Sequence, residues 1–278
     1  MTTLEDIKRI PVIDRLHRLF KIPYRLSYKT FGGKGPTVIL LHGIAVTSES
    51  WSNLLDLFDD DFNVVAIDLL GFGDSPKPQN INYDLTDHAK SIHSTIRRIG
   101  IKKPYIIIGH SMGSLIAIHY TKLYRNEVKR LVLCSPPIYY NDRGDSDALM
   151  SNWLKRSNNI YMKAYETLRT NQGLTFASAK AISSISLNRI NFDLDQATWY
   201  SFCQSLKHSI ENQTSFKELG LIKIKIDIIY GKLDGFLITS NIKSLIRINP
   251  QITYTSISTG HSISKSYAKT IMKIINNQ

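Results

Sequence analysis

Six short runs of apolar residues, rich in β-branched side chains, limit the folds open to this chain of 278 residues. The runs are residues 37–41, 63–67, 105–108, 130–133, 226–230 and 252–256. Most are continuously apolar, which is typical of strands in a sheet covered by helices on both faces. Segments with the three- and four-residue spacing of amphipathic helices lie between them. Strands that alternate with helices predict a mostly parallel sheet with helices on both sides.

One connection is much longer than the others. Ser135 and Ile226 are 91 positions apart, whereas a crossover between parallel strands needs only about a dozen residues. Aromatic and aliphatic residues recur among polar ones throughout this stretch, which predicts several amphipathic helices that form a cap over the sheet. We expect a helical cap over residues 137–221, and a core domain formed by residues 1–136 and 222–278.

The most specific motif is Gly109-His110-Ser111-Met112-Gly113. A Gly-x-Ser-x-Gly pattern is common by chance, but this one directly follows a predicted strand and begins a predicted helix. Such a sharp turn strains the backbone of the central residue, and the glycines on either side leave room for the close approach. The turn is therefore expected to present the Ser111 hydroxyl at the carboxyl edge of the sheet, where the helix N-terminus favours negative charge.

Together with this motif, four further stretches resemble the α/β-hydrolase superfamily, in its branch of cap-bearing serine esterases and C–C hydrolases. His42-Gly43 ends the run 37–41, where that family builds its oxyanion loop. Residues 68–75 resemble the family's D-x-x-G-x-G-x-S turn, and residues 230–234 and 259–261 resemble the segments that carry its acid and its base. The resemblance covers the chain from the first strands to the C-terminus, apart from the cap. It implies an α/β-hydrolase fold with a mostly parallel eight-stranded sheet and a helical cap inserted before the last two strands.

Under this resemblance Ser111 is the nucleophile, His261 is the base, and Asp234 is the acid that orients the base. A seryl hydroxyl needs such a base because it is a weak nucleophile until its proton is removed. Asp234 and His261 both follow predicted strands, so both should emerge at the sheet edge that carries Ser111. The resemblance also assigns the oxyanion hole to the backbone N–H groups of Ile44 and Met112.

Each assignment has a plainer alternative. Ser111 can be an ordinary turn serine, and Asp142 can supply the acid in place of Asp234, although the motif contexts favour Ser111 and Asp234. Other histidines compete with His261 for the role of base. They lie inside family motifs with structural histidines, on predicted helices or in the cap, where other roles are expected: His42, His110, His88, His93, His119 and His208.

The apolar residues of the predicted cap suggest a pocket for an apolar substrate group between cap and sheet. Most cap aromatics are expected to be core residues. Only some of five candidates are expected to contact substrate: Met150, Trp153, Tyr161, Tyr165 and Trp199. The turn at residues 68–75 is expected to shape the backbone and to take no part in the chemistry.

Composition and charge limit the kinds of partner and cofactor that we expect. The formal net charge is +12, but basic residues are scattered among acidic ones, so we expect no nucleic-acid partner. This charge leaves open a weak association with an anionic surface. Cys134 and Cys203 have no metal-ligand spacing, and we expect neither a metal nor an organic cofactor. The first residues lack the apolar core of a signal peptide and no apolar run reaches 18 residues, so we expect a cytoplasmic protein without a transmembrane segment.

The sequence therefore predicts a serine hydrolase that cleaves a carboxylic ester with a small or medium, partly apolar acyl group through an acyl-enzyme. Two alternatives stay open. The same three residues can serve the hydrolysis of a C–C bond, a lactone or a thioester. A protein that keeps these residues but turns over slowly can instead act as a small-molecule receptor. The oligomeric state and the natural substrate are not predicted.

Overall fold

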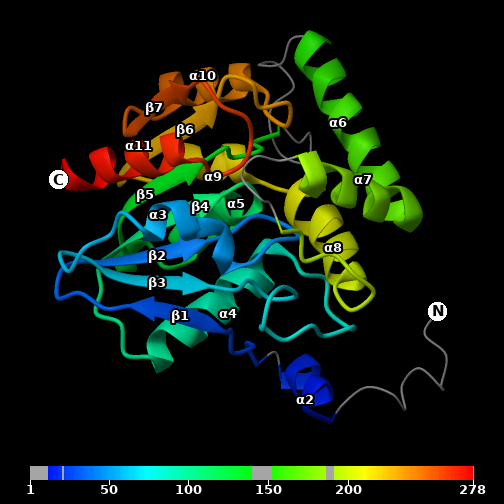
Figure 1. Cartoon of the computed structure of the whole chain (residues 1–278), viewed down its shortest axis with the longest axis horizontal. Coiled ribbons are helices and arrows are strands. Elements are labelled where there is room, and N and C mark those ends of the chain that lie inside the picture. The colour runs from blue at the N-terminus through cyan, green and yellow to red at the C-terminus, as the bar shows by residue number, and fades with distance from the viewer. Residues whose placement is uncertain (1–11, 21, 140–151, 186–190, 278) are drawn as a thin grey trace.

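A seven-stranded sheet forms the centre of the computed structural model, which describes residues 12–20, 22–139, 152–185 and 191–277 (Figure 1). The strand order is β1-β3-β2-β4-β5-β6-β7. β1 runs antiparallel to β3, and every other neighbouring pair is parallel. The strands are β1 (Tyr28–Phe31), β2 (Thr37–Leu41), β3 (Asn63–Ile67), β4 (Tyr105–His110), β5 (Val128–Cys134), β6 (Lys225–Gly231) and β7 (Ile252–Ile257).

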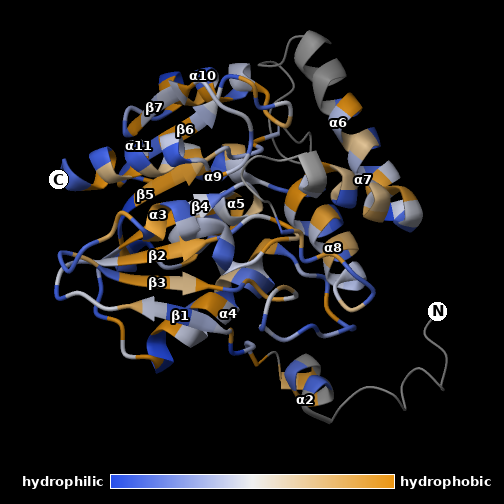
Figure 2. Ribbon diagram, viewed as in Figure 1, coloured by the Kyte–Doolittle hydropathy of each residue, from blue (hydrophilic) through white to orange (hydrophobic). Residues whose placement is uncertain are grey.

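The inner strands form because their side chains are apolar on both faces. All residues of β2 and β4 are buried, and Figure 2 shows β2, β3 and β5 as largely hydrophobic ribbons. Successive side chains of a strand point to opposite faces. Ile39 and Leu41 accordingly belong to one buried cluster, whereas Val38 and Leu40 belong to the other. The sheet therefore separates two apolar layers, as the continuous runs predict.

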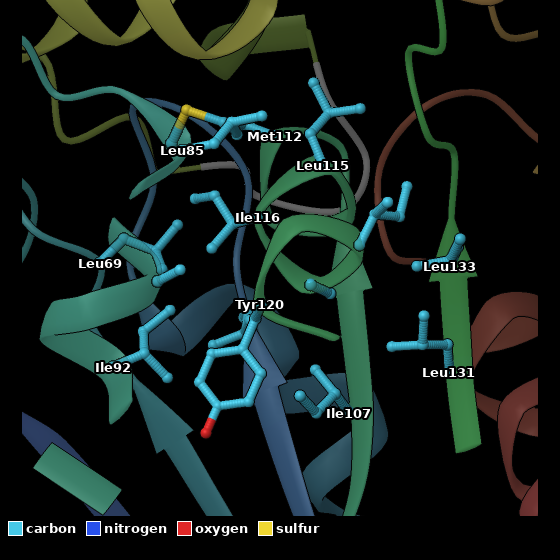
Figure 3. Close-up of a cluster of buried hydrophobic side chains, with 14 of the residues drawn as sticks. Leu69, Leu85, Ile92, Ile107, Met112, Leu115, Ile116, Tyr120, Leu131 and Leu133 are labelled. Atoms are coloured by element: carbon cyan, nitrogen blue, oxygen red, sulfur yellow. The ribbon is translucent and has the colours of Figure 1, made fainter. Parts of the chain in front are cut away.

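Helices cover both layers. α3 (Ser52–Leu55) and α11 (Lys265–Asn276) pack on one face. The other face is covered by α4 (Leu85–Arg98), α5 (Met112–Leu123), α9 (Ser215–Leu221) and α10 (Thr239–Ile248). In Figure 3, Ile116 and Tyr120 of α5 lie between Ile92 of α4 and Ile107 of β4. This packing fixes the start of α5 against the end of β4, which is where the Gly-x-Ser-x-Gly motif lies.

The long connection between β5 and β6 contains further helices, as the sequence predicts. They are α6 (Asn152–Thr170), α7 (Gln172–Ile185), α8 (Trp199–Ser205), a π-helical turn (Leu206–Glu211) and α9. Figure 1 shows α6, α7 and α8 beyond the carboxyl ends of the parallel strands. A remaining helix, α2 (Val12–Phe20), precedes the sheet, and short 3₁₀ turns lie at Ser48–Trp51 and Arg125–Glu127.

The sheet differs from the predicted one in its strand count, which is seven in the described residues and not eight. Residues 22–27, which precede β1, form no strand. The N–H groups of Tyr24 and Leu26 donate to the hydroxyls of Ser91 and Thr95 on α4, at 3.3 and 2.9 Å. Side chains of a helix thus satisfy backbone donors that an eighth strand would otherwise pair.

Candidate active site

Ser111 lies at the turn between β4 and α5, with φ 52° and ψ −121°. Its N–H donates to the carbonyl of Cys134 on β5, at 2.9 Å. A Cβ at Gly113 would lie 2.2 Å from the carbonyl oxygen of Leu41, and one at Gly109 would lie 2.5 Å from that of Gly113. Only glycine fits at these two positions, because backbone segments meet there with no room for a side chain. The motif therefore forms the strained elbow that the sequence predicts.

Three side chains from separate strand ends form a continuous hydrogen-bonded chain. His261 Nε2 lies 2.9 Å from Ser111 Oγ, and His261 Nδ1 lies 2.8 Å from Asp234 Oδ2. Since a carboxylate only accepts, Nδ1 carries the proton and Nε2 is free to accept from the serine. This tautomer can remove the proton of the Ser111 hydroxyl.

Asp234 is a buried carboxylate with several donors; its side chain has no exposed surface. Burial by itself would raise its pKa, but the contact with His261, the Ser135 hydroxyl and the Phe236 N–H together hold the pKa of Asp234 below its ordinary value. Ser135 Oγ donates at 2.5 Å and the Phe236 N–H at 2.9 Å. The carboxylate is therefore kept charged against His261.

Sequence reasoning missed Ser135 and its partner Tyr267. The Tyr267 hydroxyl lies 2.6 Å from Ser135 Oγ, and both side chains are buried. Because the single proton of Ser135 goes to Asp234, Tyr267 is the donor in this pair. Ser135 could have been noticed because it lies two residues after the run 130–133. Tyr267 carries no such signal, since it is one aromatic residue on an amphipathic helix.

The loop after β2 is held by a neutral histidine. His42 Nδ1 donates to the carbonyl of Gly43 at 2.7 Å, and its Nε2 accepts from the N–H of Leu69 at 2.8 Å. Burial lowers the pKa of His42 to about 4, so the ring is uncharged at neutral pH. The Gly43 carbonyl shares one planar peptide unit with the Ile44 N–H. Fixing that carbonyl therefore also fixes the direction of the Ile44 N–H.

The two backbone groups that the sequence assigns to an oxyanion hole both belong to segments beside Ser111. Met112 begins α5, so its N–H is one of the terminal donors without an intrahelical acceptor. Gly43 and Ile44 line the same cavity as Ser111, and a Cβ at Gly43 would lie 3.3 Å from the Ser111 Cβ.

A cavity of about 340 Å³ opens at Ser111 and His261, between the sheet edge and the helices of the β5–β6 connection. One wall is polar and includes Thr47, Glu49 and Asn53. The wall from the β5–β6 insertion is mainly apolar and includes Leu168, Phe192, Leu194, Phe202, Leu206 and Ile210. No Lys or Arg occurs among the described residues that line it.

Of the five residues predicted to contact substrate, the structure places one in the cavity and two outside it, and the side chains of two are not described. Tyr165 lines the cavity, but Tyr161 and Trp199 do not. The Tyr161 hydroxyl donates to the carbonyl of Gly235 at 2.7 Å, and Trp199 packs against the rings of Phe176 and Phe202. Both are therefore packing residues. Outside the described part of the structure lie Met150, the alternative acid Asp142 and the side chain of Trp153.

The six apolar lining residues just named from the β5–β6 insertion were missed. Four of them have the spacing of any amphipathic helix, whereas Phe192 and Leu194 lie outside the helices. The sequence alone could therefore not separate pocket residues from core residues.

Other histidines have separate surroundings. His110 also lines the cavity, but its Nε2 donates to the carbonyl of His261 at 2.8 Å, and burial lowers its pKa to about 3. His88 is fully buried. His119 contacts Thr86 and Glu218, on α4 and α9. None of these histidines is hydrogen-bonded to Ser111, whereas His261 is.

Within the described ranges, no group of three or more His, Cys, Asp or Glu side chains is arranged to hold a metal ion. Over those same residues, no helix has the length and apolar character needed to cross a membrane. Cys134 and Cys203 are both free thiols.

Comparison of the sequence with known protein families places the chain in a family of hydrolases. The sequence profile of the alpha/beta hydrolase fold matches residues 36–265, which is most of the chain. A stretch of 104 residues is 36% identical to the probable lysophospholipase BODYGUARD 4 of Arabidopsis thaliana, covering 37% of this chain and 25% of that protein. The chain spans about a quarter to a third of the length of the curated relatives that it matches.

Solved structures agree over nearly the whole chain. A thermophilic esterase from Thermogutta terrifontis has a TM-score of 0.72 at 17% identity, with 91% of this chain and 93% of that chain covered. An enol-lactonase from Burkholderia xenovorans LB400 has a TM-score of 0.71 at 16% identity, with 91% and 95% covered. At this identity the structures compare in fold alone. The profile match and the shared fold together show that the chain belongs to the alpha/beta hydrolase fold family.

Proposed function

We propose that this protein is a serine hydrolase that cleaves carboxylic esters with a small or medium, partly apolar acyl group through an acyl-enzyme. The observation that supports it most is the hydrogen-bonded chain from Ser111 through His261 to Asp234, which opens on a cavity. A serine with a base in reach and a buried acid behind that base is the arrangement that activates a hydroxyl for acyl transfer.

In the proposed reaction Ser111 Oγ attacks the ester carbonyl carbon while its proton passes to His261 Nε2. Asp234 stabilises the imidazolium, and the N–H groups of Ile44 and Met112 bind the oxyanion. The imidazolium then protonates the leaving alcohol, which departs and leaves Ser111 acylated. Water repeats the sequence with the same proton transfers, and the free acid and the free Ser111 are restored.

The lining of the cavity supports an uncharged, partly apolar substrate. An acyl chain can pack on the apolar wall from the β5–β6 insertion, and the polar wall near Glu49 suits the leaving alcohol. Since no Lys or Arg lines the cavity among the described residues, an acidic substrate such as a diketone acid is disfavoured. The similar proteins include an esterase, an enol-lactonase and a probable lysophospholipase, which agrees with ester or lactone hydrolysis.

We also propose that residues 137–221 form the cap and that residues 1–136 and 222–278 form the core domain. A cytoplasmic location is proposed as well, for which two free thiols are weak support because thiols persist in a reducing compartment.

Ser111→Ala is expected to abolish the hydrolysis of p-nitrophenyl butyrate, with a loss of roughly 10⁴-fold or more in kcat, because it removes the hydroxyl that is hydrogen-bonded to His261 Nε2. Ser266→Ala removes an exposed serine of α11 and is expected to leave kcat unchanged. Steady-state kinetics on both variants, with circular dichroism to confirm folding, decides the matter. A folded Ser111→Ala protein with undiminished turnover would refute the proposal.

A further inference from the structure

A second hydrogen-bonded group connects the inserted helices to the loop that carries Ile44. Asp193 lies in the segment between α7 and α8, where its N–H donates to the carbonyl of Ala45 at 2.8 Å. Its carboxylate Oδ2 accepts from the N–H of Gly73 at 2.6 Å. One residue of the β5–β6 insertion thus holds both the loop after β2 and the loop after β3.

The loop held by Asp193 is strained. Ala45 is buried and has φ 55°, in the left-handed region that is unfavourable for a residue with a Cβ. Such a conformation persists where the surrounding contacts over-determine it. The bond from His42 to the Gly43 carbonyl restrains the loop on one side of Ile44, and the bond from Asp193 to Ala45 restrains it on the other. The Ile44 N–H lies between the two restraints.

The remaining restraints of this loop come from the core. Asp68 Oδ1 accepts from the N–H of Ser48 at 2.8 Å, and its Oδ2 accepts from the N–H of Asp74 at 3.0 Å. The left-handed Gly73 fits against Asp68, since a Cβ there would lie 2.4 Å from the carboxyl group. These two core loops are therefore already bonded to each other through Asp68, and Asp193 adds a further connection to them from the β5–β6 insertion.

The residues on either side of Asp193 face the substrate cavity. Phe192 and Leu194 both line it, on the wall that suits an acyl chain. A group that fills the cavity therefore presses on the two neighbours of the residue that restrains Ala45. The same short segment, residues 192–194, therefore contacts both the contents of the cavity and the loop that carries the Ile44 N–H.

We infer that residues 192–194 form a substrate-responsive latch, in which an acyl chain packed on Phe192 and Leu194 seats Asp193 on Ala45 and Gly73 and so fixes the Ile44 N–H. This inference rests on the proposed ester hydrolysis. Asp193 is a positioning residue, because it acts on the reacting atoms through the loop. Contacts between the acyl chain and this segment are then expected to raise kcat and not only to lower KM. The binding energy of a part of the substrate away from the reacting bond is in this way used to stabilise the transition state.

A series of p-nitrophenyl esters from acetate to octanoate tests the latch in the full-length protein. In the wild type, kcat is expected to rise with acyl length until the cavity is filled. Asp193→Ala removes the carboxylate bond to the Gly73 N–H and keeps the backbone bond to Ala45, so the segment is then held at one point and not at two. In this variant the rise is expected to disappear, with a loss of about tenfold in kcat for the longer esters and a change in KM below about twofold. Asp193→Asn keeps a side-chain oxygen for the Gly73 N–H and is expected to restore most of the rise.

Asp195→Ala is the matched control. The Asp195 carboxylate accepts from the N–H groups of Ala197 and Thr198 in the same segment and does not contact the loop after β2. We expect it to keep the wild-type dependence of kcat on acyl length. The latch is wrong if Asp193→Ala keeps that dependence, or if both variants lower kcat equally for acetate and octanoate.

A second readout separates failure of the latch from failure of the proposed function. Octanamide, an uncharged compound with the same acyl chain, is expected to slow amide hydrogen exchange at residues 44–46 in the wild type but not in Asp193→Ala. If the wild type hydrolyses no ester, the proposed function is wrong, and the exchange measurement then tests the latch independently of activity. Equal slowing in both proteins, or none in the wild type, overturns the latch.

Discussion

At the scale of single residues, the account depends on how the Asp234 charge is maintained. Ser135 follows β5 with φ 47°, another left-handed residue at a strand end, and this places its hydroxyl on the Asp234 carboxylate. Tyr267 in turn donates to Ser135. A buried carboxylate with these donors stays ionised, which keeps the tautomer of His261 correct for accepting a proton from Ser111.

Ser135→Ala is expected to lower kcat/KM by about 10-fold and to move the acid limb of its pH profile to higher pH. The hydroxyl stabilises the charged form of Asp234, so its loss raises the pKa of that carboxyl, and protonation then begins at a higher pH. Tyr267→Phe leaves the bond from Ser135 to Asp234 in place and should shift the limb less. An acid limb that is unchanged in Ser135→Ala would contradict this role.

The convergence of Ser111, Asp234 and His261 was predictable from the sequence, because the carboxyl ends of parallel strands meet at one edge of a sheet. Ser135 and Tyr267 were not. A serine after a strand and a tyrosine on a helix become partners only when the register of β5 against β6 and the packing of α11 are known. The same holds for Asp193, whose partners lie on two loops of the core.

At the scale of elements, the start of α5 is held close against β2. The helix crosses so close to β2 that the Gly113 position touches the carbonyl oxygens of Leu41 and His42. Contact this close draws the Ser111 elbow and the His42 loop together. The helix can therefore not move without displacing both groups that the proposed reaction needs.

Gly113→Ala is expected to destabilise the protein by about 3 kcal/mol, since the new Cβ would lie 2.2 Å from backbone that cannot retreat. Gly32→Ala is the control, because no atom lies within 4 Å of its Cβ position, and its change should stay within about 1 kcal/mol. Urea unfolding measures both free energies. Equal stability of the two variants would show that the close approach of α5 to β2 is not needed.

The inner strands could be predicted from their apolar runs, because burial on both faces leaves a continuous signal in the sequence. β1 could not, since all four of its residues are exposed. The assignment of cap aromatics failed for a similar reason. Whether Tyr161 or Phe192 faces the cavity depends on the rotation of each segment in the folded chain, which helical spacing does not determine.

At the scale of the whole molecule, three buried neutral histidines make stability depend on pH. Burial lowers the pKa to about 4 for His42 and to about 3 for His88 and His110. The unfolded chain regains the ordinary histidine pKa of about 6.5. Below about pH 6.5 the unfolded chain therefore binds more protons than the folded one, and stability falls as the pH drops, by about 1.4 kcal/mol per pH unit for each histidine.

His88→Leu is expected to weaken the fall in stability between pH 6.5 and about pH 4 by roughly a third, because one of the three groups is removed. Neither ring nitrogen of His88 has a hydrogen-bond partner in the described part of the chain, so no bond is lost. Unfolding temperatures measured across this pH range test the claim. Parallel curves for variant and wild type would contradict it.

The central claim is that the elbow delivers Ser111 to His261 as a nucleophile, and covalent trapping tests it most directly. A fluorophosphonate should form one adduct, located by peptide mass spectrometry on the peptide that contains Ser111. His261→Ala should slow its formation strongly, and Ser111→Ala should show no adduct. An adduct on another residue, or an unlabelled Ser111 in the folded wild type, would contradict the account.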